Sequence, residues 1–259
     1  MKPAYKTTEI TSYDISSDNV VNQRFFAAYR ESVRYVSGDL LELGCGVGKG
    51  LEVFLPNCDS YTAIDKNKNI TDYLQKKYPQ ANFINAFIPP FQGIADASMD
   101  TVISQQVIEH IEDDAAFVGE YARVMRPGAQ GVIVTPNRAM SLTRNPWHVR
   151  EYSAEELEAL LRRYFSKVTL WGLFGSDRVM EYHEQNRHSV RRITRFDVLD
   201  LQHRLPRRLL QVPYDVLNRL NRKRLQAEAP ELVRGVTDAD FFLDRPTEQA
   251  FDWFCLVEK

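Results

Sequence analysis

Two kinds of hydrophobic pattern alternate along the chain. Short, nearly continuous apolar runs predict buried strands, and the stretches between them carry apolar residues three or four positions apart, as amphipathic helices do. This alternation predicts an α/β fold with a Rossmann-like, doubly wound and mostly parallel sheet of seven strands. We expect the strands at residues 40–43, 61–65, 82–86, 100–104, 131–135, 168–171 and 251–257.

Helix signals separate these strands. Residues 19–35 have helical spacing, whereas residues 1–17 are polar and are expected to be irregular. Ser153 and Glu156 match a capping box, which predicts a helix over residues 157–164. Further helices are expected to begin near Lys49, Asn69 and Asp113.

About seventy-five residues separate Gly175 from the last strand, too many for a structureless loop in a compact fold. Pro206 and Pro213 divide this segment, so we expect two or three helices that form a lid or a docking surface. Their apolar positions are Val198, Leu201, Leu205, Leu209, Leu210, Val216, Leu217 and Leu220.

The same segment is basic. Residues 176–235 hold 13 Lys and Arg against 8 Asp and Glu, whereas the whole chain has a net charge of −2. Three interpretations stay open: a solvated helical face, a clamp for an anionic small substrate, or docking to a nucleic acid or a membrane surface.

A glycine-rich turn follows the first strand. Gly44, Gly46 and Gly48 occupy alternate positions, so no frame gives the G-x-G-x-x-G of dinucleotide-binding turns. The spacing also lacks the first glycine and the Ser or Thr of a P-loop. Asp65 ends the next strand, where an acid can accept hydrogen bonds from both hydroxyls of a ribose.

Together with Glu42, the turn reads E-x-G-x-G-x-G and resembles motif I of the class I S-adenosylmethionine (SAM) dependent methyltransferases. Three later segments, 99–104, 107–111 and 126–129, are similar to the family's "FDxVxS", "VxEHI" and "xPGG" motifs. Residues 135–137 with 148–153 resemble the methyltransferase type 11 subgroup that includes the ubiquinone-pathway O-methyltransferases.

The resemblance implies SAM as cofactor and S-adenosylhomocysteine as product. It also implies four regions: a helical segment 1–38 over the cofactor site, a SAM-binding core 39–175, a basic helical insertion 176–248, and a last strand within 249–259. For the SAM carboxylate we favour Arg24, with Lys49 second. The cofactor-binding residues that we expect are Arg24, Glu42, Gly44, Cys45, Gly46, Gly48, Asp65, Lys66, Asn85, Ala86, Gln105 and Gln106.

The expected reaction is in-line displacement of the sulfonium methyl group by a small-molecule or glycan-type acceptor, at oxygen. A hydroxyl acceptor benefits from a general base, for which His148 and His110 are the candidates. For His110, a structural hydrogen bond that fixes the turn is the competing interpretation. A non-catalytic SAM-binding protein and a methyltransferase for RNA or another substrate are the alternative functions.

A divalent metal site is a further hypothesis. Some relatives hold a divalent ion with E-x-x-E-H and a later histidine, and this chain resembles them at Glu109, His110 and His148. Gln106 stands in the fourth place, and a neutral amide is a weaker ligand for a hard cation than a carboxylate. We therefore expect no metal.

Composition bears on the cellular compartment and on the class of partner. Three cysteines without metal spacing fit a reduced, cytoplasmic protein, and neither an apolar run of membrane-spanning length nor a signal peptide is evident. The near-neutral charge gives no signal for a nucleic-acid partner, while an anionic acceptor is one interpretation of the basic insertion.

Overall fold

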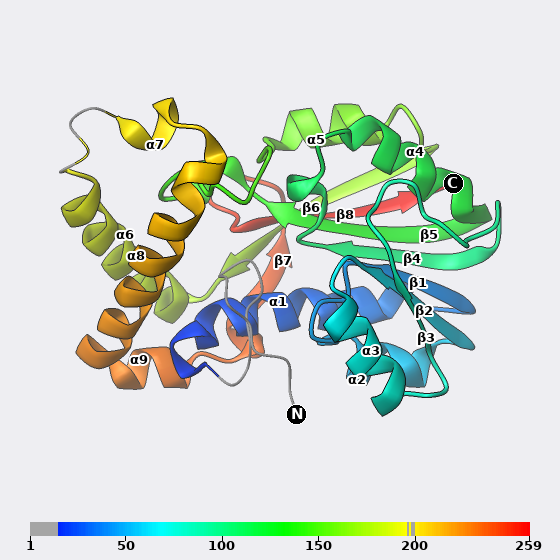
Figure 1. The fold of residues 1–259 in the computed structure, drawn as a ribbon, viewed down its shortest axis with the longest axis horizontal. Coiled ribbons are helices and arrows are strands. Elements are labelled where there is room, and N and C mark those ends of the chain that lie inside the picture. The colour runs from blue at the N-terminus through cyan, green and yellow to red at the C-terminus, as the bar shows by residue number, and fades with distance from the viewer. Residues whose placement is uncertain (1–14, 196, 198–199) are drawn as a thin grey trace.

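The expected strands form one sheet, together with an eighth strand that the sequence pattern did not reveal (Figure 1). The computed structural model describes residues 15–195, 197 and 200–259. The strand order is β3-β2-β1-β4-β5-β8-β6-β7. The strands are β1 Asp39–Leu43, β2 Ser60–Asp65, β3 Asn82–Asn85, β4 Met99–Gln105, β5 Met125–Pro136, β6 Lys167–Gly175, β7 Phe241–Asp244 and β8 Asp252–Glu258.

The doubly wound arrangement is confirmed. Strands β1 to β5 pair in parallel, and the chain order reverses between β1 and β4. Ligands bind in the crevice at such a reversal, outside the carboxyl ends of the strands. Strand β8 is antiparallel to both β5 and β6, so the mixed part of the sheet is confined to one side.

The count of seven strands was wrong, because the segment predicted to be helical ends in β7. This four-residue strand pairs antiparallel with β6 at the edge of the sheet. A short edge strand needs little apolar alternation, and only Phe241 of β7 is fully buried. The sequence therefore carried too weak a strand signal there.

Helices cover both faces of the sheet (Figure 1). Alternate side chains along a strand pack into two separate hydrophobic cores, one on each face of the sheet. Leu40, for example, belongs to one core and Leu41 to the other. Helices α1 Asn19–Ser32, α2 Leu51–Phe54 and α3 Lys68–Lys77 pack on the first core, and α4 Asp114–Val124 and α5 Ala154–Leu161 on the second. The capping box of Ser153 and Glu156 at the start of α5 is confirmed.

The insertion stands beside the sheet as four helices: α6 Asp177–Thr194, α7 Leu201–Arg204, α8 Arg207–Glu228 and α9 Pro230–Gly235 (Figure 1). Pro206 precedes α8 as expected, but the predicted break at Pro213 is wrong, because this residue lies inside α8. Pro213 lacks the N–H for the Leu209 carbonyl, and both residues are exposed, so water can take that bond. Val198 and residues 1–14 lie outside the described residues.

None of the helices in the described part of the chain is both long and apolar enough to cross a bilayer.

The helices α6 and α8 are held together by buried polar contacts. Ser189 of α6 donates to Asn221 Oδ1 at 2.5 Å, and Asn221 Nδ2 donates to Asn186 Oδ1 at 2.7 Å. Arg222 joins α8 to the N-terminal side through Asp18, at 2.8 Å.

One buried carboxylate connects β1 with its neighbours. Glu42 is 1% exposed, and its oxygens accept hydrogen bonds from Tyr29 of α1, at 3.0 Å, and from Tyr61 of β2. Burial raises the pKa of Glu42 to about 7, although the two tyrosine hydroxyls act in the opposite direction. The carboxyl group therefore keeps its proton to a much higher pH in the folded chain than in the unfolded chain.

This difference predicts a pH effect on stability. Between about pH 4.5 and 7 the unfolded chain loses the Glu42 proton first, so rising pH favours unfolding. Glu42→Gln lacks this contribution. From pH 5 to pH 8, the free energy of unfolding should therefore fall by roughly 1–3 kcal/mol more in the natural chain than in the variant. Chemical denaturation at both pH values measures it.

Glu52→Gln, which changes an exposed acid on α2, is the control variant. Parallel pH dependence of the natural chain and Glu42→Gln would show that the pKa of Glu42 is not raised by folding.

Candidate functional site

The glycine turn packs closely against the loop after β4. Gly44 has a φ of +73°, and a Cβ atom built on it would lie 2.4 Å from a methyl group of Val107. Its N–H donates to the Ile64 carbonyl at 2.8 Å. A side chain at this position would push the turn away from the point where the strand order reverses.

Gly46 differs because its missing side chain faces open space. Its φ is +50°, and no heavy atom lies within 4 Å of a Cβ built there. Its N–H donates to Asp65 Oδ2 at 2.9 Å, and Asn67 N–H donates to Asp65 Oδ1 at 2.8 Å. Both donors are backbone groups, and the one at Gly46 sets the Asp65 carboxylate beside the turn. A carboxylate accepts hydrogen bonds from hydroxyl groups. An open backbone turn beside such an acid fits the adenosyl part of SAM.

The end of β3 completes this side of the site. Asn85 Nδ2 donates to the Asp65 carbonyl at 3.0 Å, and the Ala86 N–H reaches the same oxygen at 3.2 Å. The next residue, Phe87, was missed by the sequence analysis and is 77% exposed. The sequence did offer a signal for Phe87, because it is a large apolar residue just beyond the carboxyl end of a predicted strand. An aromatic ring at such a position can stack on a base.

Other expected cofactor residues lie within or beneath the turn. Both carboxylate oxygens of Glu42 accept from tyrosines, and Cys45 is 2% exposed. A Cβ on Gly48 would lie 2.7 Å from Leu51, so this glycine faces the core. These three residues support the turn from below, while Lys66 is exposed beyond Asp65.

The two glutamines at the carboxyl end of β4 point in different directions. Gln105 is 6% exposed and donates to Ser32 Oγ at 3.1 Å, away from the open site. Gln106, with a φ of +56°, donates to Asp252 Oδ1 at 3.2 Å. Arg24 Nε lies 3.2 Å from the other oxygen of Asp252, so both side chains meet at this acid.

Asp252 at the start of β8 is fully buried and was not predicted. Burial raises its pKa, and the Arg24 charge opposes that rise. The second candidate for the SAM carboxylate, Lys49, has its Nζ 2.6 Å from Asn22 Oδ1. Burial lowers the pKa of Lys49 to about 7.

A cavity of about 640 Å³ opens between the sheet edge and the insertion. Polar residues at the sheet edge form one part of its lining, among them Arg24, Gln106, Glu109 and Glu151. Helices α6 to α8 supply its apolar wall, with Val190, Ile193, Leu201, Leu210, Pro213 and Leu217.

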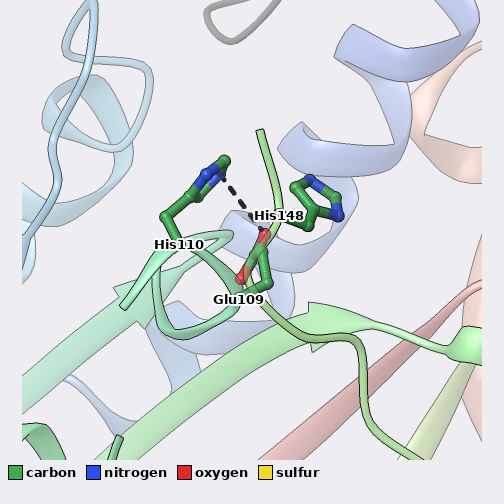
Figure 2. A group of neighbouring side chains, drawn as sticks. All are labelled: Glu109, His110 and His148. Carbon is green, nitrogen blue, oxygen red and sulfur yellow. Dashed lines mark ion pairs between the residues drawn. The ribbon is translucent and has the colours of Figure 1, made fainter. Parts of the chain in front are cut away.

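Both predicted histidines line this cavity, with Glu109 between them (Figure 2). His110 Nδ1 lies 2.9 Å from the Trp147 carbonyl, which can only accept, so Nδ1 carries the proton in the neutral ring and Nε2 is the basic nitrogen. His110 Nε2 lies 4.0 Å from Glu109 Oε1. The expected structural hydrogen bond of His110 is therefore present, and it also fixes the tautomer.

Glu109 is 0% exposed, and burial raises its pKa to about 7. Its Oε2 accepts from Thr135 Oγ1 at 3.0 Å, whereas Oε1 has no hydrogen-bond partner among the described residues. Proton uptake by His110 would place a cation beside this carboxyl group and stabilise its charged form.

His148 is held from both sides. Its Nδ1 lies 2.5 Å from Glu151 Oε1, and its Nε2 lies 2.8 Å from the side-chain nitrogen of Asn145. The rings of His110 and His148 meet edge to face, with centroids 4.9 Å apart. Glu151 was not predicted, although its position three residues after His148 was a usable signal.

The possible metal ligands do come together: one ligand atom each from Glu109, His110 and His148 lie within 4.8 Å of one another. Both ring nitrogens of His148 already have partners, however, and the Gln106 amide is turned toward Asp252. A metal would have to displace these contacts, so the absence of a metal stays our prediction.

Comparison with known proteins agrees with the fold and the cofactor. Residues 41–133 match a methyltransferase domain family. A probable SAM-dependent methyltransferase of Mycobacterium tuberculosis is 32% identical over 191 residues, which cover 71% of this chain and 69% of the relative. The human thiol S-methyltransferase TMT1A is 29% identical over 150 residues, covering 51% of this chain and 61% of that protein.

Among solved structures, a SAM-dependent methyltransferase from Archaeoglobus fulgidus superposes with a TM-score of 0.57 at 15% identity and covers 96% of this chain and 100% of its own. That likeness concerns the fold alone. The sequence relationship, the doubly wound sheet and the open glycine turn beside Asp65 lead to one conclusion: this chain belongs to the SAM-dependent methyltransferases, and SAM is its cofactor.

Proposed function

We propose that the chain transfers the methyl group of SAM to a hydroxyl oxygen of a small-molecule or glycan-type acceptor bound in the 640 Å³ cavity. The observation that carries this proposal is the group of Glu109, His110 and His148 on the cavity lining. A neutral hydroxyl is a poor nucleophile, and this group offers it a proton acceptor.

When bound, SAM supplies a methyl group activated by its sulfonium. In the proposal Asp65 accepts hydrogen bonds from the ribose hydroxyls, and the turn at Gly46 lies against the nucleoside. Asn85 and Ala86 would contact the adenine, and the exposed ring of Phe87 would offer the base a stacking surface. The SAM carboxylate is assigned to Arg24, which keeps its contact with Asp252.

His110 is the first choice for the general base. Its Nδ1 donates to the Trp147 carbonyl, so Nε2 is the basic nitrogen that would take the acceptor's proton. Glu109 stabilises the resulting charge. His148, held by Glu151, is the second choice, because its Nε2 must first give up Asn145. The base shares the cavity with Gln106, and the apolar wall excludes water from the acceptor.

Thiol S-methylation is a second candidate. It is favoured by the similarity to thiol S-methyltransferase TMT1A, which covers about half of this chain. A thiol has an ordinary pKa of about 8.5, so it ionises near neutral pH and depends much less on a base. The two functions therefore differ in their need for His110.

Label transfer tests the proposed function. Methyl-labelled SAM, incubated with the protein and a fractionated small-molecule and glycan extract, should give alkali-stable O-methyl products. Alkali-labile label would indicate methyl esters, and label on an added dithiol would favour the thiol function. SAM binding without any transfer would support the non-catalytic alternative.

The cofactor turn is tested by Gly46→Ala. The added methyl group enters the open space beside Asp65, so the affinity for SAM should fall at least about tenfold, on the scale of 1.4 kcal/mol or more. Calorimetric titration with SAM and S-adenosylhomocysteine measures the loss.

Gly128→Ala is the matched control, since Gly128 also has a positive φ and open space around a built Cβ. Both variants place alanine in the left-handed region, which costs roughly 1–2 kcal/mol and lowers the melting temperature by a few degrees. Equal SAM affinity in the two variants would remove Gly46 from the proposed site.

The base is tested by His110→Asn. Loss of general-base catalysis should lower kcat for a hydroxyl acceptor by roughly 10²–10⁴-fold, while SAM affinity stays within about twofold. The exposed His188→Asn on α6 is the control, and His148→Asn compares the second candidate. Unchanged kcat in both His110→Asn and His148→Asn would refute base catalysis by this pair.

Metal removal is a separate test. Because both nitrogens of His148 are engaged, dialysis against a chelator should leave methyl transfer unchanged. Activity that disappears and returns with Mg²⁺ or Mn²⁺ would overturn the prediction and assign Glu109, His110 and His148 to an ion.

A further inference from the structure

Helix α8 carries an apolar stripe on its outer surface. Four aliphatic side chains point away from the rest of the chain: Leu209 is 63% exposed, Val212 71%, Val216 53% and Leu220 60%. They recur every three or four residues and therefore lie on one side of the helix. We call these four residues the outer stripe.

Basic residues accompany the outer stripe, and acids are missing from it. Arg208, Lys223 and Arg224 are exposed, and the exposed residues of this fully described helix between 208 and 227 include no Asp or Glu. Glu228, exposed at the end of α8, pairs with Arg224, whose Nε lies 2.6 Å from Glu228 Oε1, so the positive border depends on Arg208 and Lys223. The acid between residues 208 and 227, Asp215, is half-buried and accepts from Trp147 Nε1 at 3.0 Å. The surface is thus aliphatic with a positive border.

The outer stripe is continuous with the cavity. Leu217 is 45% exposed and also lines the cavity, as do Leu201 at 42% and Ile193 at 37%. Pro213, one residue after Val212 in α8, is likewise exposed and lines the cavity. The apolar wall of the cavity therefore passes directly into the exposed apolar surface of α8.

We propose that the outer stripe of α8 docks on an anionic lipid surface. An amphipathic helix with aliphatic residues on one side and Lys or Arg beside them lies in the interface, with its apolar side in the boundary of the acyl chains. Each basic residue near an anionic membrane contributes attraction, while exposed aliphatic side chains lose their contact with water. Lipid is thus complementary to the stripe in both respects.

A second copy of the chain fits the stripe less well. Symmetric pairing of two α8 helices would place the same surface on both sides of the interface. Arg208 and Lys223 would then face a partner surface whose exposed acid on α8, Glu228, already pairs with Arg224. Like charges at close range repel, so an anionic partner is favoured over self-association.

Docking on a lipid surface would also determine which acceptors reach the cavity. A cavity whose apolar wall opens at the lipid surface can take an acceptor with an aliphatic part directly from the membrane, with its hydroxyl reaching His110. This consequence rests on the proposed function, whereas docking does not, so vesicle binding is measured without an acceptor.

Vesicle co-sedimentation tests the docking. The full chain should bind vesicles of phosphatidylcholine mixed with phosphatidylglycerol, and bind vesicles of phosphatidylcholine alone at least about tenfold more weakly. Binding should fall as salt rises, because mobile ions screen the attraction between the basic residues and the lipid.

Two double variants separate the contributions. Val212→Ser with Val216→Ser should abolish most binding by removing aliphatic contacts. Arg208→Gln with Lys223→Gln should weaken binding to the anionic vesicles roughly 10- to 30-fold, at about 1 kcal/mol for each charge. The control is Lys76→Gln with Arg163→Gln, two exposed cations on other elements, which should bind as the natural chain does.

All variants change exposed side chains, so unchanged melting temperature and SAM affinity verify that they are folded. Absence of vesicle binding by the natural chain, or equal binding by the Val212→Ser/Val216→Ser variant, would overturn the proposal. Sedimentation equilibrium reveals the alternative: a dimer that the serine substitutions dissociate, without vesicle binding, would assign the stripe to contact between copies.

Discussion

The burial of Glu42 is the constraint on which the cofactor side of this structure depends. A carboxyl group without water must be neutral or well supplied with donors, and Tyr29 and Tyr61 provide the donors from α1 and β2. Three elements are thereby fixed around the end of β1, directly beneath the glycine turn. The open space at Gly46 therefore has a defined position. If the backbone below it shifted, the Glu42 carboxyl group would be exposed or would lose its hydrogen-bond donors.

A similar arrangement occurs at the cavity, where Asp252 accepts a hydrogen bond from Gln106 and lies beside Arg24. These side chains come from β8, from the loop after β4 and from α1. Together with Glu109 they put ionisable groups under one wall of the cavity, while the insertion supplies the apolar wall. The polar part belongs to the frame of the sheet, and the apolar part belongs to the segment inserted between β6 and β7.

Much of this could be predicted from the sequence, because turn chemistry and strand alternation are local. Gly44, Gly46 and Asp65 follow from spacing, and the doubly wound sheet follows from periodicity. Phe87 and Glu151 had local signals that became informative only with the fold, whereas Asp252 could not be assigned from spacing, since its significance depends on which chain ends meet in space. The same limit explains β7, whose pairing with β6 comes from residues about seventy positions away. Pro213 was misjudged because tertiary packing and exposure let α8 continue through it.

The pairing of β6 with β7 has a consequence for how such a chain can change. The insertion leaves the sheet after Gly175 and returns at Phe241, its direct partner in the ladder, and Ser176 and Asp240 bond across the base, N–H to carbonyl at 2.8 Å. The segment between Gly175 and Phe241 therefore begins and ends at the same point on the edge of the sheet. Segments of different length and polarity could be exchanged there during evolution, so that acceptor choice diverges while the methyl-donor half is inherited intact.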